Sequence, residues 1–483
     1  MHFTTVQRIL GVLLMVFSLT MLPPLAISLW VADGAVIGFT DAFILTLGLG
    51  LGIWLPVRHK RQELRVRDGF LVVVLFWSVL GLTGSLPFLL AESSNMSITD
   101  SVFESVSGLT TTGATVIVGI DELPMSILYY RQQLQWLGGM GIIVLAVAVL
   151  PMLGIGGMQL YRAETPGPVK DNKLTPRITE TAKALWYIYL GLTVSCILAY
   201  WLGGMEFFDA LGHGFSTVAI GGFSTHDESI GFYDSRVIEM IAVVFMLLSG
   251  ANFALHFLAV RRRSLRSYLE DSEFRGYITT LGIVFLLVTT ALYLMGVYGT
   301  LDESITRGLF QAVSIGTTTG FTTADYSLWP GFISILLLFT SFVGGCAGST
   351  GGGIKVIRFL LLIKQGIREI NRLIHPNAEI PIRIGGKTIP WRVVEAVWGF
   401  FALYVASFGV MYLALASTGL DLMTSFSAVA ASMNNLGPGL AGVGAHYADI
   451  NDTAKWILCF AMLLGRLEIF TLLVLLTPAF WRK

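Results

Sequence analysis

The stretch of sequence that decides the fold reads GLTTTGATVIVG and covers residues 108–119. Its core, TTTG, returns in IGTTTGFTTADY at residues 315–326. A threonine triplet closed by glycine is poor material for a membrane helix, because β-branched residues and glycine both have low helix propensity. The return of such a segment in a very apolar chain predicts equivalent positions in a repeated architecture.

The composition of the chain predicts an integral membrane protein. Of its 483 residues, 54% are hydrophobic and only 13% are charged, and the mean hydropathy is +0.73. Soluble chains carry nearer a quarter charged residues. The formal net charge is zero, so no overall field favours nucleic acid. Cys196, Cys346 and Cys459 are scattered through apolar or glycine-rich segments, which argues against a disulfide framework.

Apolar runs predict ten membrane crossings. They cover about residues 9–31, 37–57, 69–91, 127–153, 184–203, 236–260, 276–298, 331–363, 392–416 and 454–478. The first run is too long for a signal peptide, and no clear small-residue cleavage site follows it, so we expect a retained helix. Most of the 31 Lys and Arg residues fall on one side of this arrangement, which the positive-inside rule makes cytoplasmic.

Four pairs of these spans are joined by segments that are too short to cross a bilayer. Each joining segment reads as a short half-helix, such as residues 100–109, that a glycine turn brings to an end. The other three turns lie in FSTVAIGGFSTHD (215–227), VSIGTTTGFTTAD (313–325) and AASMNNLGPGLAG (430–442). The copies align on one glycine each, and a second glycine follows each at equal spacing: Gly113 with Gly141, Gly222 with Gly250, Gly320 with Gly348, and Gly437 with Gly465.

Four glycine turns in register predict a pathway for a cation. Non-helical backbone persists at membrane depth only where it is buried in protein or lines water. Glycine adopts positive φ without steric cost, so turns around one axis can direct their carbonyl oxygens inward, and such rings replace the water shell of an alkali ion. The half-helices also point their partially negative C-terminal ends at that axis. One such break alone is more often a helix kink, and its threonines either pack behind the turn or offer hydroxyl oxygen.

We therefore expect an all-α integral membrane protein with four span–pore-helix–span repeats around a pseudo-fourfold central pore, plus two leading transmembrane helices. The leading helices take residues 1–68. The expected repeats, interrupted by a cytoplasmic linker at 364–390, cover residues 69–161, 184–263, 276–363 and 391–483.

Several motifs resemble the Trk/Ktr/HKT superfamily of potassium transporters, and within it the Trk-type pore subunit. They are SGLTTTGAT, TVAIGGFSTHD, IGTTTGFTT, NNLGPGL, GGCAGSTGGGIKV, HPNA and GRLEIFTLL, and the likeness covers essentially the whole chain. The resemblance implies potassium uptake across a bacterial cytoplasmic (inner) membrane by a multi-pass homodimer with a cytoplasmic C-terminus. It also implies contact with membrane lipids and a cytosolic nucleotide-binding regulatory subunit. The nucleotide is expected on that partner only, with no covalent cofactor.

The resemblance assigns the selectivity filter to the four aligned glycines. In that superfamily, serine at the first filter position accompanies sodium preference, so Gly113 favours potassium. The second copy, AIGGF, lacks the threonine before its glycine, and the fourth reads NNLG, so the expected ring is chemically uneven. The expected potassium-binding residues are Thr111, Thr112, Gly113, Ile220, Gly221, Gly222, Thr318, Thr319, Gly320, Asn435, Leu436 and Gly437.

The eighth span predicts a gate below the filter. As one helix, residues 331–363 would measure roughly 50 Å, far more than a bilayer needs. Residues 344–353 contain six glycines, and each costs a helix about 1 kcal/mol relative to alanine. A passive kink or a close-packing surface is the alternative. The string is no phosphate loop, because it lacks G-K-[ST] and no strand precedes it. The expected gate residues are Gly345, Cys346, Ala347, Gly348, Ser349, Thr350, Gly351, Gly352 and Gly353, with Arg466.

Arg466 is the one basic residue that we place deep inside a predicted span. An arginine at the bilayer centre costs about 2.5–3.5 kcal/mol, so it needs a partner or a water-filled cavity. It follows Gly465, which the repeat alignment puts at the depth of the glycine loop. We expect Arg466 to face the conduit, to donate hydrogen bonds to loop carbonyls and to add an electrostatic barrier to cations. The alternative is an ion pair with a carboxylate such as Glu468.

The remaining polar features have ordinary interpretations. Acidic residues of the outer loops concentrate cations modestly, or simply solvate those loops, which we favour; they are Asp121, Glu122, Asp227, Glu228 and Asp325. His213 is expected to serve packing. The basic and apolar segment 364–378 either lies on the inner membrane surface or binds the regulatory subunit.

Two other functions compete with a gated potassium conduit. A potassium symporter coupled to protons or sodium would use inverted repeats and broken helices, whereas four copies in the same direction fit a central pore better. An enzyme is not expected, because the chain has no H-E-x-x-H motif, no cysteine cluster and no nucleophile elbow.

Overall fold

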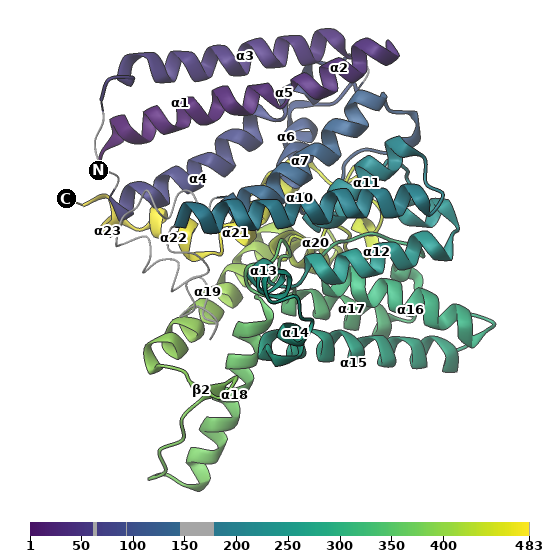
Figure 1. Cartoon of the computed structure of the whole chain (residues 1–483), viewed down its shortest axis with the longest axis vertical. Coiled ribbons are helices and arrows are strands. Elements are labelled where there is room, and N and C mark those ends of the chain that lie inside the picture. Colours follow the sequence, from purple (N-terminus) through teal and green to yellow (C-terminus); the bar gives the residue numbers. More distant parts are fainter. Residues whose placement is uncertain (61–64, 93, 145–177, 483) are drawn as a thin grey trace.

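The computed structural model describes residues 1–60, 65–92, 94–144 and 178–482. Within these ranges the structure is helical apart from short turns and one hairpin, β1 (Arg383–Ile384) and β2 (Lys387–Thr388), whose strands pair antiparallel. Two long helices, α1 (Phe3–Leu19) and α3 (Val36–Trp54), pack side by side at one edge of the molecule with α2 (Leu22–Val31) (Figure 1). These are the two leading crossings that the sequence predicts.

The rest of the chain consists of four similar helical units. Each unit has a long helix, a short half-helix and a second helix. The first unit comprises α4 (Val66–Thr83), α6 (Ile98–Leu109) and α7 (Met125–Val144), with α5 (Leu86–Leu90) between α4 and α6; the second comprises α10 (Ile178–Leu202), α11 (Phe207–Ala219) and α12 (Arg236–Ser249). The third comprises α15 (Ser272–Leu294), α16 (Leu301–Gly316) and α17 (Gly331–Val343), and the fourth α19 (Trp391–Ala416), α20 (Leu422–Met433) and α21 (Asp452–Arg466).

The four units close into a ring. In every unit the half-helix packs against both of its own long helices, and the last helix also packs against the half-helix of the next unit. The contacting pairs between units are α7 with α11, α12 with α16, α17 with α20, and α21 with α6. The predicted pseudo-fourfold arrangement of four repeats is therefore confirmed, although the end of the first expected repeat, at residue 161, lies outside the described residues.

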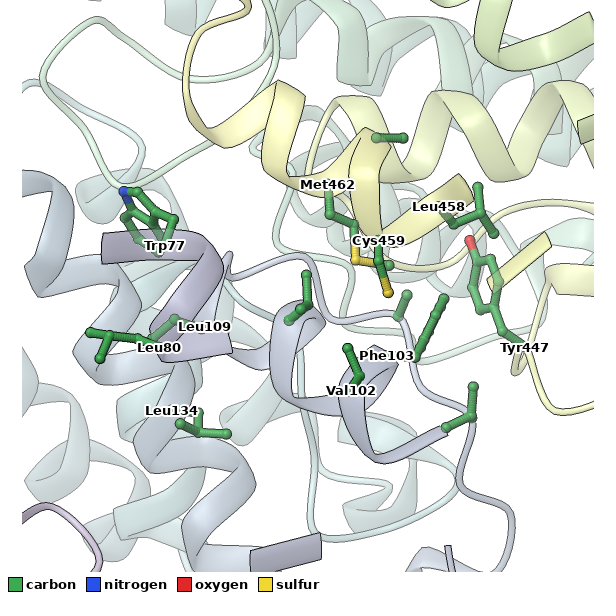
Figure 2. Close-up of a cluster of buried hydrophobic side chains, with 14 of the residues drawn as sticks. Trp77, Leu80, Val102, Phe103, Leu109, Leu134, Tyr447, Leu458, Cys459 and Met462 are labelled. Carbon is green, nitrogen blue, oxygen red and sulfur yellow. The ribbon is translucent and has the colours of Figure 1, made fainter. Parts of the chain in front are cut away.

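The contact that closes the ring is an apolar cluster between the first and fourth units. Figure 2 shows Val102 and Phe103 of α6 facing Cys459 and Met462 of α21, and all four belong to one buried cluster. The Phe103 ring lies 5.4 Å, between centroids, from the Tyr447 ring that precedes α21. All three cysteines of the chain are buried and free, as their scattered positions predict. The closure thus rests on ordinary side-chain packing.

Two of the predicted crossings, residues 236–260 and 454–478, each consist of two helices that meet at a sharp bend. α12 and α13 (Phe253–Arg262) meet at 95°, and α21 and α22 (Phe470–Leu476) meet at 116°. The first bend is stabilised from outside, because the Gly250 carbonyl accepts a hydrogen bond from the Cys346 N–H at 2.8 Å, and the Phe253 N–H donates to the Gly348 carbonyl at 3.1 Å. Backbone groups freed by the bend therefore find partners in the loop after α17.

Six helices in the described ranges are long and apolar enough to cross a membrane, or eight if each bent pair counts as one crossing. Two of the ten predicted crossings do not pass this criterion. The fourth is α7, whose predicted continuation to residue 153 lies outside the described residues, and the eighth stops after the 13 residues of α17. The chain is a multi-pass membrane protein.

The eighth crossing is broken where the sequence predicts. α17 ends at Val343, and α18 (Val356–Ile374) begins only after the glycine-rich segment. α18 does not stop at the expected boundary after residue 363. It continues through most of 364–378 and reaches away from the bundle beside the hairpin (Figure 1). Two short helices, α14 (Arg266–Glu270) and α23 (Pro478–Trp481), complete the α-helices of the described ranges, and short 3-10 helices lie in several of the connections.

Candidate ion pathway

Each of the four half-helices ends in the same backbone turn. The residue two positions before each aligned glycine is left-handed, with φ of 52° at Thr111, 55° at Ile220, 67° at Thr318 and 52° at Asn435. The next N–H then donates back to a carbonyl five residues earlier, at 2.8–2.9 Å, and together these features define a Schellman motif. The sequence interpretation that a glycine ends each half-helix is therefore wrong: a side-chain-bearing residue ends it, and the glycine follows.

The aligned glycines adopt a second positive φ, of 83° at Gly113, 80° at Gly222, 85° at Gly320 and 98° at Gly437. Each glycine faces the neighbouring unit so closely that no side chain fits. A Cβ added to each would meet the carbonyl oxygen of the residue before the next glycine: Gly113 meets Gly221, Gly222 meets Thr319, Gly320 meets Leu436, and Gly437 meets Thr112. The four turns, predicted from sequence to share one axis, form a closed ring.

Side chains behind the ring hold the turns in three different ways. In the first and third turns two threonine hydroxyls bond each other, Thr110 to Thr112 at 2.8 Å and Thr317 to Thr319 at 2.7 Å. In the fourth turn the Asn435 amide donates to the Thr112 hydroxyl at 3.0 Å and to the Met462 carbonyl at 3.1 Å. The second turn has neither device, and polar residues of α7 lie behind it.

The polar face of α7 includes a buried ion pair that the sequence interpretation missed. Arg131 donates to the Glu104 carboxylate at 2.8 Å and to the Ser224 carbonyl at 3.1 Å, and both side chains are almost fully buried. Glu104 also accepts from the Thr115 hydroxyl and the Val116 N–H. This network ties the segments that follow the first two turns. The expectation that Arg466 is the one deeply placed basic residue is thus wrong.

The glycine-rich loop 344–353 lies against the ring of turns. Its Thr350 hydroxyl donates to the Val218 carbonyl of the second unit at 3.0 Å. The Gly352 N–H donates to the hydroxyl of Thr318 at 2.7 Å, and the Gly353 N–H donates to the Asn434 carbonyl at 3.1 Å. One loop thus contacts the second, third and fourth units where their half-helices end.

Arg466 reaches the loop from the end of α21. Its guanidinium donates to the Thr350 carbonyl at 3.1 Å and to the Gly138 carbonyl of α7 at 3.3 Å, and its side chain is 7% exposed. The predicted hydrogen bond to a loop carbonyl is therefore present. The alternative pairing with Glu468 is wrong, because the Glu468 carboxylate forms its ion pair with Arg358 of α18. Whether Arg466 opposes cation passage stays a prediction.

Glu273, at the start of α15, is a second residue that the sequence interpretation missed. Its buried carboxylate accepts hydrogen bonds from the Ala347 N–H at 2.7 Å and from the Ile357 N–H at 3.3 Å. It therefore holds one turn of the loop to the first turn of α18. Lys355 is also buried and donates to the Gly351 carbonyl. No sequence spacing links Glu273 to the loop, because 74 residues separate it from Ala347.

At the opposite end of the ring, the five acidic residues of the outer loops are all exposed, as solvated loops predict. One basic side chain joins two of these loops. His226 contacts the Asp121 carboxylate, lies 3.2 Å from that of Asp209, and stacks on Phe232 with ring centroids 3.5 Å apart. Burial alone would lower the pKa of His226, but its hydrogen bonds to Asp209 and Asp121 outweigh burial and raise that pKa. His213 is buried and hydrogen-bonded to Ser224, consistent with packing.

Taken together, the structure brings all four glycine turns, the glycine-rich loop and Arg466 to one axis. In the described ranges no group of three or more His, Cys, Asp or Glu side chains is placed to hold a metal ion. Backbone carbonyls and threonine hydroxyls are among the oxygen atoms at the ring. The fold and this site define a class of helical membrane protein in which four re-entrant turns meet in one ring.

Comparisons with known proteins identify the family. The family model TrkH, described as a cation transport protein, matches residues 37–483, and the chain belongs to this family. It is 58% identical, over the full length of both chains, to the "Trk system potassium uptake protein TrkH" of Vibrio parahaemolyticus serotype O3:K6 and 55% identical to that of Escherichia coli K12. Its fold superposes with a TM-score of 0.92 on the "Crystal Structure of the Potassium Transporter TrkH from Vibrio parahaemolyticus", at 56% identity and full coverage of both chains. The family is one of transport proteins, not of enzymes.

Proposed function

We propose that this protein carries potassium into the cell through the ring of four glycine turns. The closed ring is the main observation that supports the proposal. Each aligned glycine lies against the carbonyl oxygen of the residue that precedes the aligned glycine of the next turn. Carbonyl rings coordinate dehydrated alkali ions, and four half-helices direct their partially negative ends at the same place. Relatives that are similar over the full length of the chain are named potassium uptake proteins, which supports potassium as the ion.

The potassium site consists of the backbone carbonyls of the four turns, at the twelve filter residues given above. Gly113 keeps the first turn free of a serine side chain and so favours potassium over sodium. Loop 344–353 is the gate, and the support for this is that it bonds to the ends of three of the half-helices and that Arg466 bonds to its Thr350 carbonyl. The four repeats, with the boundaries expected from sequence, act as one conducting unit.

The setting of this activity is also part of the proposal. The protein works as a homodimer in the bacterial inner membrane, with its C-terminus in the cytoplasm, and a cytosolic nucleotide-binding subunit regulates the gate. α18 reaches beyond the bundle (Figure 1). Because α18 begins at Val356, just after the gate loop, movement of α18 would pull on that loop. Nucleotide binds the regulatory subunit and not this chain.

The test is ion flux in proteoliposomes that contain the purified protein. Potassium and rubidium uptake should exceed sodium uptake and should change when a cytosolic nucleotide-binding subunit and its nucleotide are added. Single-channel recording in a planar bilayer separates a conduit from a coupled symporter, because discrete openings that pass many ions require a conduit. Sodium uptake equal to potassium uptake, or transport strictly coupled to protons, would contradict the proposal.

A further inference from the structure

The second turn of the ring lacks the side chains that hold the others. Its sequence is Ala219, Ile220, Gly221 and Gly222, so no hydroxyl is present where the first and third turns have paired threonines. The backbone is nevertheless the same, with a left-handed residue, a Schellman hydrogen bond and a positive-φ glycine. A β-branched residue such as Ile220 is costly in the left-handed region, so something outside the turn must hold it there.

Gln135 of α7 lies where that support is needed. Its side-chain amide donates to the Gly221 carbonyl at 2.6 Å and accepts from the Phe223 N–H at 3.0 Å, and the residue is fully buried. The two bonds fix the amide orientation, because the flipped amide would face an acceptor with an acceptor and a donor with a donor. Gln135 therefore bridges the residues on both sides of Gly222.

The amide also fills the space of the missing side chain. A Cβ added at Gly221 would overlap the amide carbon and oxygen of Gln135. Gly221 aligns with Thr112 and Thr319, and its φ does not lie in the left-handed range, so its backbone alone would accept a threonine. A glutamine from the neighbouring unit has thus taken the place of a side chain within the turn.

We propose that Gln135 is a positioning residue that sets the ion selectivity of the second turn. The Gly221 carbonyl that it holds is the one that abuts Gly113 of the first turn, so the position of this oxygen also defines the contact between two units. Without Gln135, the carbonyl is free to shift toward a smaller ion, and the ring loses discrimination between rubidium and sodium. This inference rests on the proposed function. It assigns to Gln135 the role of keeping the ring selective although its four turns differ in side chains.

The test uses Gln135→Met, which keeps most of the side-chain volume and removes both hydrogen bonds. Gln133→Met is the matched control, because Gln133 lies on the same helix, is also buried, and donates only to the Thr20 carbonyl of the leading helices. The rubidium-to-sodium uptake ratio in proteoliposomes is the readout, since it does not depend on the amount of protein. We expect a fall of about threefold to tenfold for Gln135→Met, the range that corresponds to the net contribution of one hydrogen bond, and no change for Gln133→Met.

If Gln135→Met does not accumulate, Gln135→Asn serves in its place, because the shorter amide cannot reach both backbone groups and should lower the ratio in the same way. A ratio unchanged in the Gln135 variants, or lowered equally by Gln133→Met, would overturn the inference. Gly320→Ala, measured in the same assay, distinguishes the position of the filter from the role of Gln135. If Gly320→Ala changes the ratio and the Gln135 variants do not, only the role of Gln135 fails. If neither changes it, the filter itself is wrongly placed.

Discussion

Four residues that carry side chains adopt the left-handed backbone conformation at the heart of the molecule. Thr111, Ile220, Thr318 and Asn435 each end a half-helix where glycine is the usual choice. This conformation costs an L-residue roughly 1–2 kcal/mol. Such strain persists where the surroundings over-determine it, commonly at functional sites. Two of the four side chains hold their surroundings by hydrogen bonds: the Thr318 hydroxyl accepts from the Gly352 N–H, and the Asn435 amide donates to the Thr112 hydroxyl.

The aligned glycine of each turn has no room for a side chain, and this leads to a prediction for Gly320→Ala. A Cβ at Gly320 would overlap the Leu436 carbonyl, and its φ of 85° is unfavourable for alanine. We expect potassium flux per protein molecule to fall about tenfold or more. The added methyl group would displace one carbonyl of the ring, and the free-energy cost of this strain exceeds ~1.4 kcal/mol, which corresponds to a tenfold change in rate. Proteoliposome uptake, normalised to reconstituted protein, measures the change.

Gly282→Ala is the control for that experiment. Gly282 lies within α15, has no neighbour within 4 Å of a built Cβ, and has no positive φ. Flux and protein level should both match those of the parent protein. Normal flux and selectivity in Gly320→Ala would show that Gly320 does not face the ion.

At the level of single residues, the sequence predicted which glycines matter but not what supports them. The repeat alignment found all four glycines because they recur within similar segments. The polar run Arg131, Gln132, Gln133 and Gln135 was the available signal for the support, since polar residues in a span are costly and mark buried partners. Arg131, Gln132 and Gln135 bond to backbone carbonyls of residues 221–224, about 90 positions further along the chain, and Gln133 bonds to the Thr20 carbonyl, more than 100 positions earlier. No local pattern connects such distant groups.

Among the larger elements, the glycine-rich loop is held from three directions. Its start bonds to the bend at Gly250, its middle to the ring, and Glu273 links Ala347 to the beginning of α18. A loop with so many polar anchors and so few side chains can exchange one set of hydrogen bonds for another at moderate cost. This property is the one that the proposed gate requires.

Arg466→Ala tests the anchor at the centre of this loop. Removing the guanidinium removes the hydrogen bond to the Thr350 carbonyl and a positive charge beneath the ring. A hydrogen bond from a charged donor contributes about 1.5–3 kcal/mol, so the unstimulated potassium flux should rise about tenfold or more. Flux without the regulatory subunit, compared with protein level in the membrane, is the measurement.

Arg466→Lys separates charge from geometry in the same assay. Lysine keeps the charge but cannot bridge the Thr350 and Gly138 carbonyls as the planar guanidinium does. An intermediate flux is expected if both contribute. Loss of protein from the membrane with unchanged flux per molecule would mean that Arg466 serves folding alone.

The same elements show why the sequence predicts some helix boundaries and misses others. The half-helix expected at 100–109 is observed at Ile98–Leu109, because a local signal, the Ser97 side chain accepting from the Asp100 N–H, begins it. The bends after α12 and α21 were missed. The first depends on hydrogen bonds between Gly250 and a loop almost 100 residues later, and hydropathy alone cannot distinguish a straight helix from a bent one of equal length.

In the whole molecule, two sets of contacts close the ring. The backbones of the four turns abut one another, and the helices around them pack from each unit to the next. Each unit contributes one helix to the next, and the last returns to the first through the cluster around Phe103 and Met462 (Figure 2). The geometry of one turn therefore depends on the neighbouring unit, as the hydrogen bond from Gln135 to the Gly221 carbonyl illustrates. A pore made by a single chain can hold four different turns in this way.

The outer loops of the first two units supply a pH-dependent link in this assembly. The neighbouring carboxylates of Asp121 and Asp209 raise the pKa of His226 above its usual value near 6.5, against the opposing effect of burial. The protonated form is therefore favoured in the folded state. Its contribution to stability is fully present below about pH 6.5 and is lost as pH rises through the higher folded-state pKa.

Thermal unfolding of the purified protein between pH 6 and pH 9 measures this link. We expect a small fall in Tm that is absent from His226→Gln, since partly exposed ion pairs contribute only about 0–1 kcal/mol. Asp302→Asn, which removes the exposed pair with Arg236, is a control that should leave the pH dependence unchanged. An identical pH dependence in His226→Gln and the parent would contradict the assignment.

The most direct test of the account is to locate the ion itself. Crystals grown with rubidium in place of potassium, and measured at the rubidium absorption edge, give an anomalous map of bound ions. The account predicts a peak on the axis of the ring, surrounded by carbonyl oxygens of all four turns and weakened in Gly320→Ala. Rubidium peaks that lie only away from this axis, in a protein that still transports rubidium, would contradict it.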